Sequence, residues 1–366
     1  MPPTKGRTYG QLLACTCKKI LDMAKPFAQL GGQTYENLVS LEEGQPVGQW
    51  RDSNNGLGGG RYPYDVNTGL MPAALRAIAE LARAGTFEDQ DGWTDIADQY
   101  AEVWETEAVG FFGSTVPRVD AKNRVEAYKV SSTFPGPSCT NQITSDIYLQ
   151  AIALSKDGSP INVIHTDACF RLLLLPHLLT SSSPNSRATH QHLLTLNHLS
   201  TSILTTFPTG LYTEAGILIA NPAYSTDPSH WHKFTTGAYH GTVVWTWNSL
   251  AMIAKGLEVQ IESADSVESK GRGGAESTDI DFYKEVVNKM RRAYRRVWDV
   301  IEKNRAHLSA EVWSWKWVGS EKEGTFEYVP LSHLPTPDGA GQTESNIRQL
   351  WSLVFLALER KRELEA

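Results

Sequence analysis

Asp52 is the acidic residue whose neighbours in the sequence most favour chemistry. It lies in GQWRDSNNGLGGGRYPYDVN, residues 48–67, directly after Trp50 and Arg51 and ahead of a run rich in glycine and asparagine. An indole that shields the Asp52 carboxyl from water would raise its pKa, whereas a guanidinium that points toward it would lower that pKa. The stretch therefore predicts either a general acid or an Asx residue that caps the turn DSNNG.

The same stretch and three later loops share one composition, in which aromatic rings alternate with amides, hydroxyls and carboxylates. The later loops are residues 210–224, 230–248 and 310–352. Sugars require this mixture, because their ring faces stack on aromatic side chains while their hydroxyls need paired donors and acceptors. We therefore expect a carbohydrate ligand.

Several side chains in these loops, Trp50 and Arg51 among them, are candidates for contact with that ligand. Arg61, Tyr64 and Asp65 are candidates to bind a sugar hydroxyl, whereas the alternative is that Asp65 or Asn67 caps the helix that follows. Tyr239 and His240 stand just before an apolar helix, where a histidine is either a substrate contact or a satisfied part of the core. Trp313, Trp315 and Trp317 alternate as strand residues do, so they could present one face to a sugar.

Composition excludes several other classes of function. The 366 residues include 34 basic and 41 acidic ones, and the formal charge of -7 disfavours nucleic acid or an anionic membrane as partner. The four cysteines form neither a zinc spacing nor a dense disulfide framework, and no segment reads as a signal peptide or a membrane span. His190 and His192 would point different ways on a helix, and the pair at 230 and 232 lacks a nearby third ligand, so we expect no metal. We also expect no cofactor and a cytoplasmic protein.

Hydrophobic periodicity predicts an all-α protein of about eight helices in one domain, residues 1–366, with small β-hairpins such as 124–132 and 326–331 in long loops. The segment 264–279 is rich in serine, glycine and charge, which predicts a disordered insertion. Residues 242–257 and 350–358 are apolar nearly all round and should be inner helices, whereas 278–304 should be a surface helix. The expected helices are 6–29, 66–84, 92–110, 145–178, 188–206, 242–262, 278–304 and 344–363.

Three motifs resemble those of the six-hairpin glycosidases, which include glucoamylases, trehalases, processing α-glucosidases and the glucosidase domain of glycogen debranching enzymes. The motifs are GQWRDS, AYHGTVVWTW and FEYVPL followed by GQTESNIRQLWSLV, which lie between residues 48 and 358. The likeness is greatest to the debranching type. It implies an (α/α)6 toroid-like barrel with the active site in the loops at one end.

The resemblance also implies an inverting glycoside hydrolase that acts on α-linked glucosides or related oligosaccharides. Asp52 would be the acid and Glu327 the base, with Glu344 as the reserve choice for the base, and their carboxyls should lie about 6.5–9.5 Å apart. The family's acid follows the fifth helix, whereas Asp52 follows the first, so the barrel would be incomplete unless a further segment or subunit completes it. The alternative is a non-catalytic carbohydrate-binding or scaffold protein that retains part of the barrel.

Overall fold

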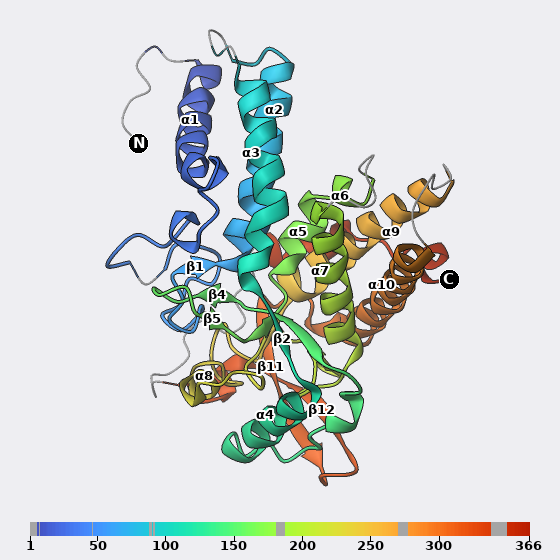
Figure 1. The fold of residues 1–366 in the computed structure, drawn as a ribbon. Coiled ribbons are helices and arrows are strands. Elements are labelled where there is room, and N and C mark those ends of the chain that lie inside the picture. The colour runs from blue at the N-terminus through green and yellow to red at the C-terminus, as the bar shows by residue number, and fades with distance from the viewer. Residues whose placement is uncertain are drawn as a thin grey trace.

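A computed structural model of the chain describes residues 6, 8–45, 47–87, 90, 92–180, 187–269, 277–337 and 350–366. Helices dominate it, and the strands form five small antiparallel sheets (Figure 1). The α-helices are α1 (Tyr9–Ala28), α2 (Met71–Arg83), α3 (Trp93–Glu107), α4 (Arg118–Ser131), α5 (Ala168–Leu174), α6 (His177–Thr180), α7 (Arg187–Leu204), α8 (Pro228–Lys233), α9 (Ile253–Ser269) and α10 (Ser277–Lys303). The sequence predicted an all-α protein, and the structure is mostly helical with small sheets.

The helices α1, α2 and α3 stand side by side and project together from one end of the molecule (Figure 1). A capping box between Thr8 and Gln11 starts α1, since each side chain accepts a hydrogen bond from the other residue's backbone N–H. Phe27 of α1 packs on Trp104 of α3, with ring centroids 4.5 Å apart. These contacts bury one face of each helix.

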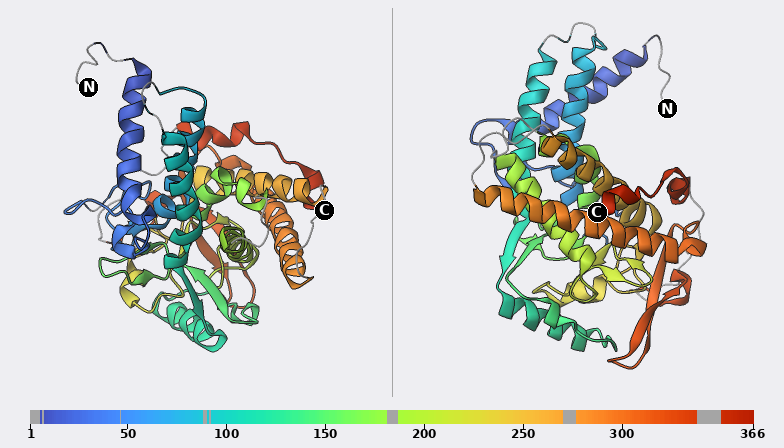
Figure 2. Two further views of the ribbon diagram at one scale, coloured as in Figure 1. Left: turned by 45° about the horizontal axis from the view of Figure 1, so that its top comes forward. Right: turned by 90° about the vertical axis from the view of Figure 1, so that its right-hand side faces the viewer.

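A second group, α5, α7, α9 and α10, forms the middle of the molecule, and α10 crosses its outer side (Figure 2). The α10 stripe that was predicted to face the core is buried, as Val286, Met290, Tyr294 and Val297 illustrate. Arg292 and Arg295 lie exposed on the opposite side of the helix. The spacing of apolar residues in 278–304 therefore predicted a surface helix correctly.

The sheet with the longest strands is antiparallel and comes from the C-terminal part of the chain. It joins β10 (Val244–Trp245), β11 (Val312–Gly319) and β12 (Gly324–Val329) in that order. The strand inferred from the alternation of Trp313, Trp315 and Trp317 is β11, and the predicted hairpin at 326–331 corresponds to β12. The other strands are β1 (Tyr62–Pro63), β2 (Gly113–Val116), β3 (Ile147–Gln150), β4 (Ala153–Leu154), β5 (Pro160–Ile161), β6 (Ile164–His165), β7 (Tyr212–Thr213), β8 (Gly216–Ile217) and β9 (Ala220–Asn221).

Several local predictions were wrong. Residues 124–132 resemble a strand but belong mostly to α4, because Ala121, Val125 and Tyr128 recur at helical spacing and are all buried. The expected helix 145–178 is instead the four short strands β3 to β6 followed by α5 and the start of α6. Short apolar runs between turns suit a strand and a buried helix equally well.

The ends of two predicted elements also differ. Helix α9 continues to Ser269 and α10 begins at Ser277, so both ends of the predicted disordered insertion 264–279 are helical, while 270–276 lie outside the described residues. The last expected helix, 344–363, consists where it is described of two 3₁₀ segments, Leu350–Ala357 and Arg362–Glu365. In the part of the chain that the structure describes, no helix has the length and apolar character required to cross a bilayer.

Candidate active site

One cavity brings together side chains from three of the four aromatic loops, namely 48–67, 230–248 and 310–352. Its volume is about 450 Å³, and it receives residues from the loop 48–52, from the segment after β1, from the entrance to α9 and from the start of β11. The described residues that line it are Gly48, Gln49, Trp50, Asp52, Asp65, Val66, Leu70, Phe170, Tyr239, Trp245, Trp247, Glu311 and Trp351. This is the size of an ordinary small-molecule site.

Two short π-helical segments position part of this lining. The first, Val66–Leu70, begins directly after Asp65 and leads into α2, and the second, Thr246–Met252, carries Trp247 and leads into α9. The Asn67 amide fixes the first segment by donating to the carbonyls of Val39 and Pro63 at 2.9 and 2.8 Å. Because π-helical turns recur at functional sites, their presence on two walls of one cavity agrees with a binding role.

The loop that carries Trp50 and Asp52 is anchored from beneath by Arg51. The Arg51 guanidinium is completely buried and donates to both carboxylate oxygens of Asp167, with the shortest contact at 2.6 Å. Gly56 is required in this loop because a Cβ there would lie 2.4 Å from the Arg51 carbonyl oxygen. The predicted ligand contact of Arg51 is thus replaced by a structural ion pair, which leaves Trp50 and Asp52 on the cavity side.

Three indoles form the apolar walls and meet almost at right angles. The Trp50 ring lies 5.1 Å from that of Trp247 and 5.7 Å from that of Trp245, with an interplanar angle of 80° in both cases. Trp245 and Trp247 are perpendicular at 6.2 Å. The His240 ring stacks on Trp245 at 5.1 Å, and Tyr239 packs against the same indole at 4.9 Å.

Three carboxyl groups line the cavity, and each has different surroundings. The Asp52 side chain is 69% exposed, and one of its oxygens lies 3.7 Å from Nε2 of the buried His240. Glu311 is buried and accepts hydrogen bonds from the Tyr239 hydroxyl at 2.7 Å and from the Trp351 indole N–H at 2.5 Å. Asp65 is buried, and neither of its oxygens has a hydrogen-bond partner among the described residues.

The buried groups around the cavity have perturbed pKa values. Burial, reinforced by the nearby charge of Asp167, raises the pKa of Asp65 to about 8, although the nearby backbone N–H of Val66 and the charge of Arg51 oppose this shift. Burial, with the charge of Arg51, lowers the pKa of His240 well below its usual range, so its imidazole is neutral at pH 7. The Ser53 hydroxyl lies 2.8 Å from Nδ1 of that imidazole and leaves Nε2 directed toward Asp52.

The raised pKa of Asp65 makes stability depend on pH. Between the ordinary value of 3.8 and about 8, the unfolded chain has released this proton while the folded chain keeps it, so folding loses stability as pH rises across that interval. We expect Asp65→Asn to remove this loss, and thus to raise the Tm relative to the wild type by several degrees more at pH 8 than at pH 5. Thermal unfolding at the two pH values measures the difference, with the exposed Glu43→Gln as control. An equal difference at both pH values would contradict it.

Unpartnered buried polar atoms are concentrated at this cavity. Besides the two Asp65 oxygens, they include Gln49 Nε2, Trp50 Nε1 and Trp247 Nε1 in the lining, and His240 Nε2 beside it. Buried polar atoms are almost always satisfied in folded proteins, so a cluster of exceptions indicates groups that a bound molecule or water completes.

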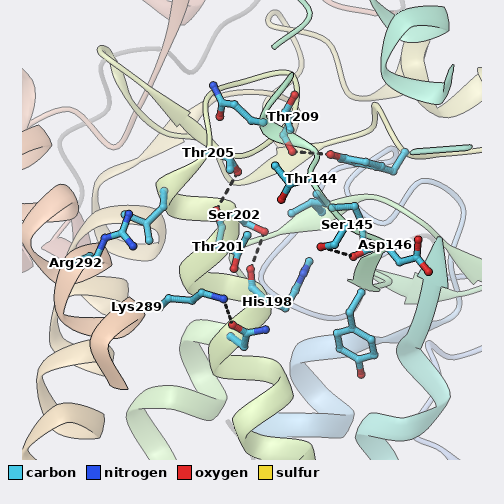
Figure 3. Close-up of a pocket in the computed structure, with 17 residues that line it drawn as sticks. Thr144, Ser145, Asp146, His198, Thr201, Ser202, Thr205, Thr209, Lys289 and Arg292 are labelled. Carbon is cyan, nitrogen blue, oxygen red and sulfur yellow. Dashed lines mark hydrogen bonds between the residues drawn. The ribbon is translucent and has the colours of Figure 1, made fainter. Parts of the chain in front are cut away.

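A second cavity gives a useful comparison (Figure 3). It has a volume of about 420 Å³ and is lined by hydroxyls of α7 such as Thr201 and Ser202, with Lys289 and Arg292 of α10 at one side. Lys289 already donates to Asn197 at 2.9 Å. Among the described residues that line this second cavity, no buried side-chain nitrogen or oxygen lacks a hydrogen-bond partner, in contrast to the first cavity.

Some residues singled out from the sequence lie elsewhere. Glu327 lies on β12 with a half-exposed side chain, and its carboxylate is 3.8 Å from the Lys316 ammonium. It does not line the cavity that contains Asp52. Glu344 lies outside the described residues. Arg61 donates to the carbonyls of Leu41, Glu42 and Gln45 and thereby fixes a loop. The buried Tyr64 hydroxyl donates to the Gln150 side chain, and the buried Trp313 indole N–H donates to the Ala215 carbonyl. Trp315 lines a separate aromatic crevice. By contrast Trp50, Asp52, Asp65 and Tyr239 all reach the cavity, and His240 adjoins it.

Sequence reasoning missed Glu311, Trp247 and Trp351 as site residues. Glu311 directly precedes β11, and its backbone carbonyl accepts a hydrogen bond from Thr246, which brings it opposite the entrance to α9. A carboxylate immediately before the strand of alternating tryptophans was the available signal. Within the described residues, no cluster of three histidine, cysteine, aspartate or glutamate side chains could hold a metal ion.

Comparison with known proteins found no match. No protein-family model matches the chain, and no curated protein or solved structure matches it either.

Proposed function

We propose that the protein is an inverting glycoside hydrolase that acts on α-linked glucosides or related oligosaccharides in the cavity of Asp52, Asp65 and Glu311. The observation that carries the proposal is the convergence of these three carboxyls in one cavity walled by indoles. Glycosidic cleavage needs a carboxylic acid to protonate the departing oxygen and a carboxylate to activate water. Aromatic walls supply the apolar surface on which a sugar ring stacks.

The positions of the carboxyls favour a division of roles. Asp52 has an exposed side chain beside the cavity, where the leaving group of a long substrate would extend into solvent, so it is our choice for the acid. Glu311 is buried and oriented by Tyr239 and Trp351, so it replaces Glu327 as our choice for the base. Asp65 would contact the bound sugar, because its unpartnered oxygens can accept hydrogen bonds from ligand groups.

The resemblance to six-hairpin glycosidases supports the same function and implies a fold. It assigns the α-helices to part of an (α/α)6 toroid-like barrel, which a further segment or subunit would complete. The four cysteines are too few and too irregularly spaced for a dense disulfide framework, which suits the reducing cytoplasm, where we place the reaction.

Release of reducing sugar from a panel of α- and β-linked glucosides and oligosaccharides tests the proposal. We expect product from at least one α-linked member, with the anomer observed first by NMR inverted relative to the substrate, because water would attack from the face opposite the leaving group. Retention of configuration would overturn the inverting assignment. Absence of product from every member would overturn the hydrolase itself.

A second candidate function is carbohydrate binding without turnover. It is favoured by the exposure of Asp52, since solvent around a carboxyl leaves it without the shelter that a general acid usually has. Titration of the same oligosaccharides by calorimetry distinguishes the two functions. Binding without product release would favour the second one.

A further inference from the structure

The cavity lining contains acidic side chains but no lysine or arginine among the described residues. The acidic side chains are those of Asp52, Asp65 and Glu311. The nearest guanidinium, that of Arg51, lies over the Trp50 ring at 4.4 Å but is held by Asp167 and by the carbonyls of Ile219 and His240. His240 is neutral. Because Asp65 keeps its proton below about pH 8 in the free protein, a positively charged ligand is favoured by Asp52 and Glu311 and by its ability to replace that proton.

The aromatic walls favour the same kind of ligand. Trp50, Trp245 and Trp247 stand mutually perpendicular, with centroids 5.1 to 6.2 Å apart, which is the corner of an aromatic box. Indole faces carry negative electrostatic potential and attract cations most strongly of all the aromatic side chains. Because His240 covers one face of Trp245, only the other face of that ring is available to a ligand.

Such a ligand would supply the hydrogen-bond donor that the Asp65 carboxyl lacks. Both of its oxygens are buried without a partner, and the charged or titratable groups that act on it are Asp167, Arg51 and the Cys169 thiol. Arg51 is already bound by Asp167, so it does not satisfy Asp65. A ligand ammonium could form the missing charge-assisted hydrogen bonds and take the place of the proton that burial retains on Asp65.

We propose that this cavity binds a sugar that carries a protonated amine, with the ammonium group between the Asp65 carboxylate and the faces of the neighbouring indoles. The inference rests on the proposed function only in taking the ligand to be a sugar. It narrows the substrate class from neutral glucosides to oligosaccharides that contain an amino sugar with a free amine.

The test compares four probes that separate charge from sugar recognition. D-glucosamine, glucose, N-acetylglucosamine and tetramethylammonium are titrated into the full chain by calorimetry at pH 7. We expect glucosamine to bind at least about tenfold more tightly than glucose and N-acetylglucosamine, which lack the charge, and more tightly than tetramethylammonium, which lacks the hydroxyls. Equal affinities for the three sugars, tightest binding of tetramethylammonium, or no binding of glucosamine would overturn the inference.

Variants identify the group responsible. In Asp65→Asn the preference for glucosamine over glucose should fall by about tenfold, while in Glu43→Gln, which changes an exposed carboxyl elsewhere, it should persist. Circular dichroism of both variants verifies that they fold, and an unchanged preference in folded Asp65→Asn would overturn the assignment. Failure of this inference differs from failure of the proposed function, since hydrolysis of neutral α-glucosides without any preference for the amine would refute the inference alone.

Discussion

Glu311→Gln is expected to lower kcat for glycoside cleavage by about 10²–10⁴-fold, which is the usual contribution of a positioned general base. Glutamine keeps the shape of the side chain, and its carbonyl oxygen can accept from the Trp351 indole N–H while its amide N–H donates to the Tyr239 hydroxyl oxygen. It cannot take a proton from water. The loss should therefore appear in kcat while KM changes little.

Matched variants determine whether the loss belongs to this carboxyl. Asp52→Asn should cause a loss of similar size if Asp52 is the acid, and the exposed Glu43→Gln should leave kcat unchanged. Initial rates on the best substrate, with circular dichroism to verify folding, provide the measurement. If Glu327→Gln abolished turnover while Glu311→Gln remained active, the base would be the residue suggested by the sequence motif.

Arg51→Met is expected to destabilise the protein by about 3–5 kcal/mol, because it leaves Asp167 buried without its counter-ion. Both side chains are fully buried, and three hydrogen bonds from the guanidinium reach the Asp167 carboxylate. Removal of Arg51 would also expose Asp65 to the unbalanced charge of Asp167. We expect a lower urea midpoint with an unchanged m value.

The double variant Arg51→Met/Asp167→Leu tests this cause. Replacement of a whole buried ion pair by apolar residues is often close to neutral, so the double variant should recover most of the stability that the single variant loses. A double-mutant cycle in urea, with Asp167→Leu as the other single variant, gives the coupling energy between the two side chains. A coupling near zero would show that the pair does not anchor the loop of Trp50 and Asp52.

The sequence predicted those elements in which an apolar stripe repeats over many residues. Helix α10 is the clearest case, since Tyr283, Val286, Met290, Tyr294 and Val297 fall on one face whatever the helix packs against. The strands β3 to β6 were missed because short segments match a helical and an extended period equally well. Their conformation is decided by neighbours such as β2, which pairs with β3 and is distant from it in the chain.

For the candidate site, the sequence by itself determined the kind of residues and the loops from which they come. Trp50, Asp52, Asp65 and Tyr239 were recognised by type, because carboxylates among aromatic rings in glycine-rich stretches rarely belong to a core. Only the tertiary structure decided which acids meet. Glu311 precedes β11 at the open end of the hairpin, where the pairing of β10 with β11 brings it to the cavity. Glu327 lies within β12, opposite and beside Lys316, and does not line the cavity. Burial likewise depends on distant neighbours, and it is burial without a hydrogen-bond partner that sets Asp65 apart from the other acids of the cavity.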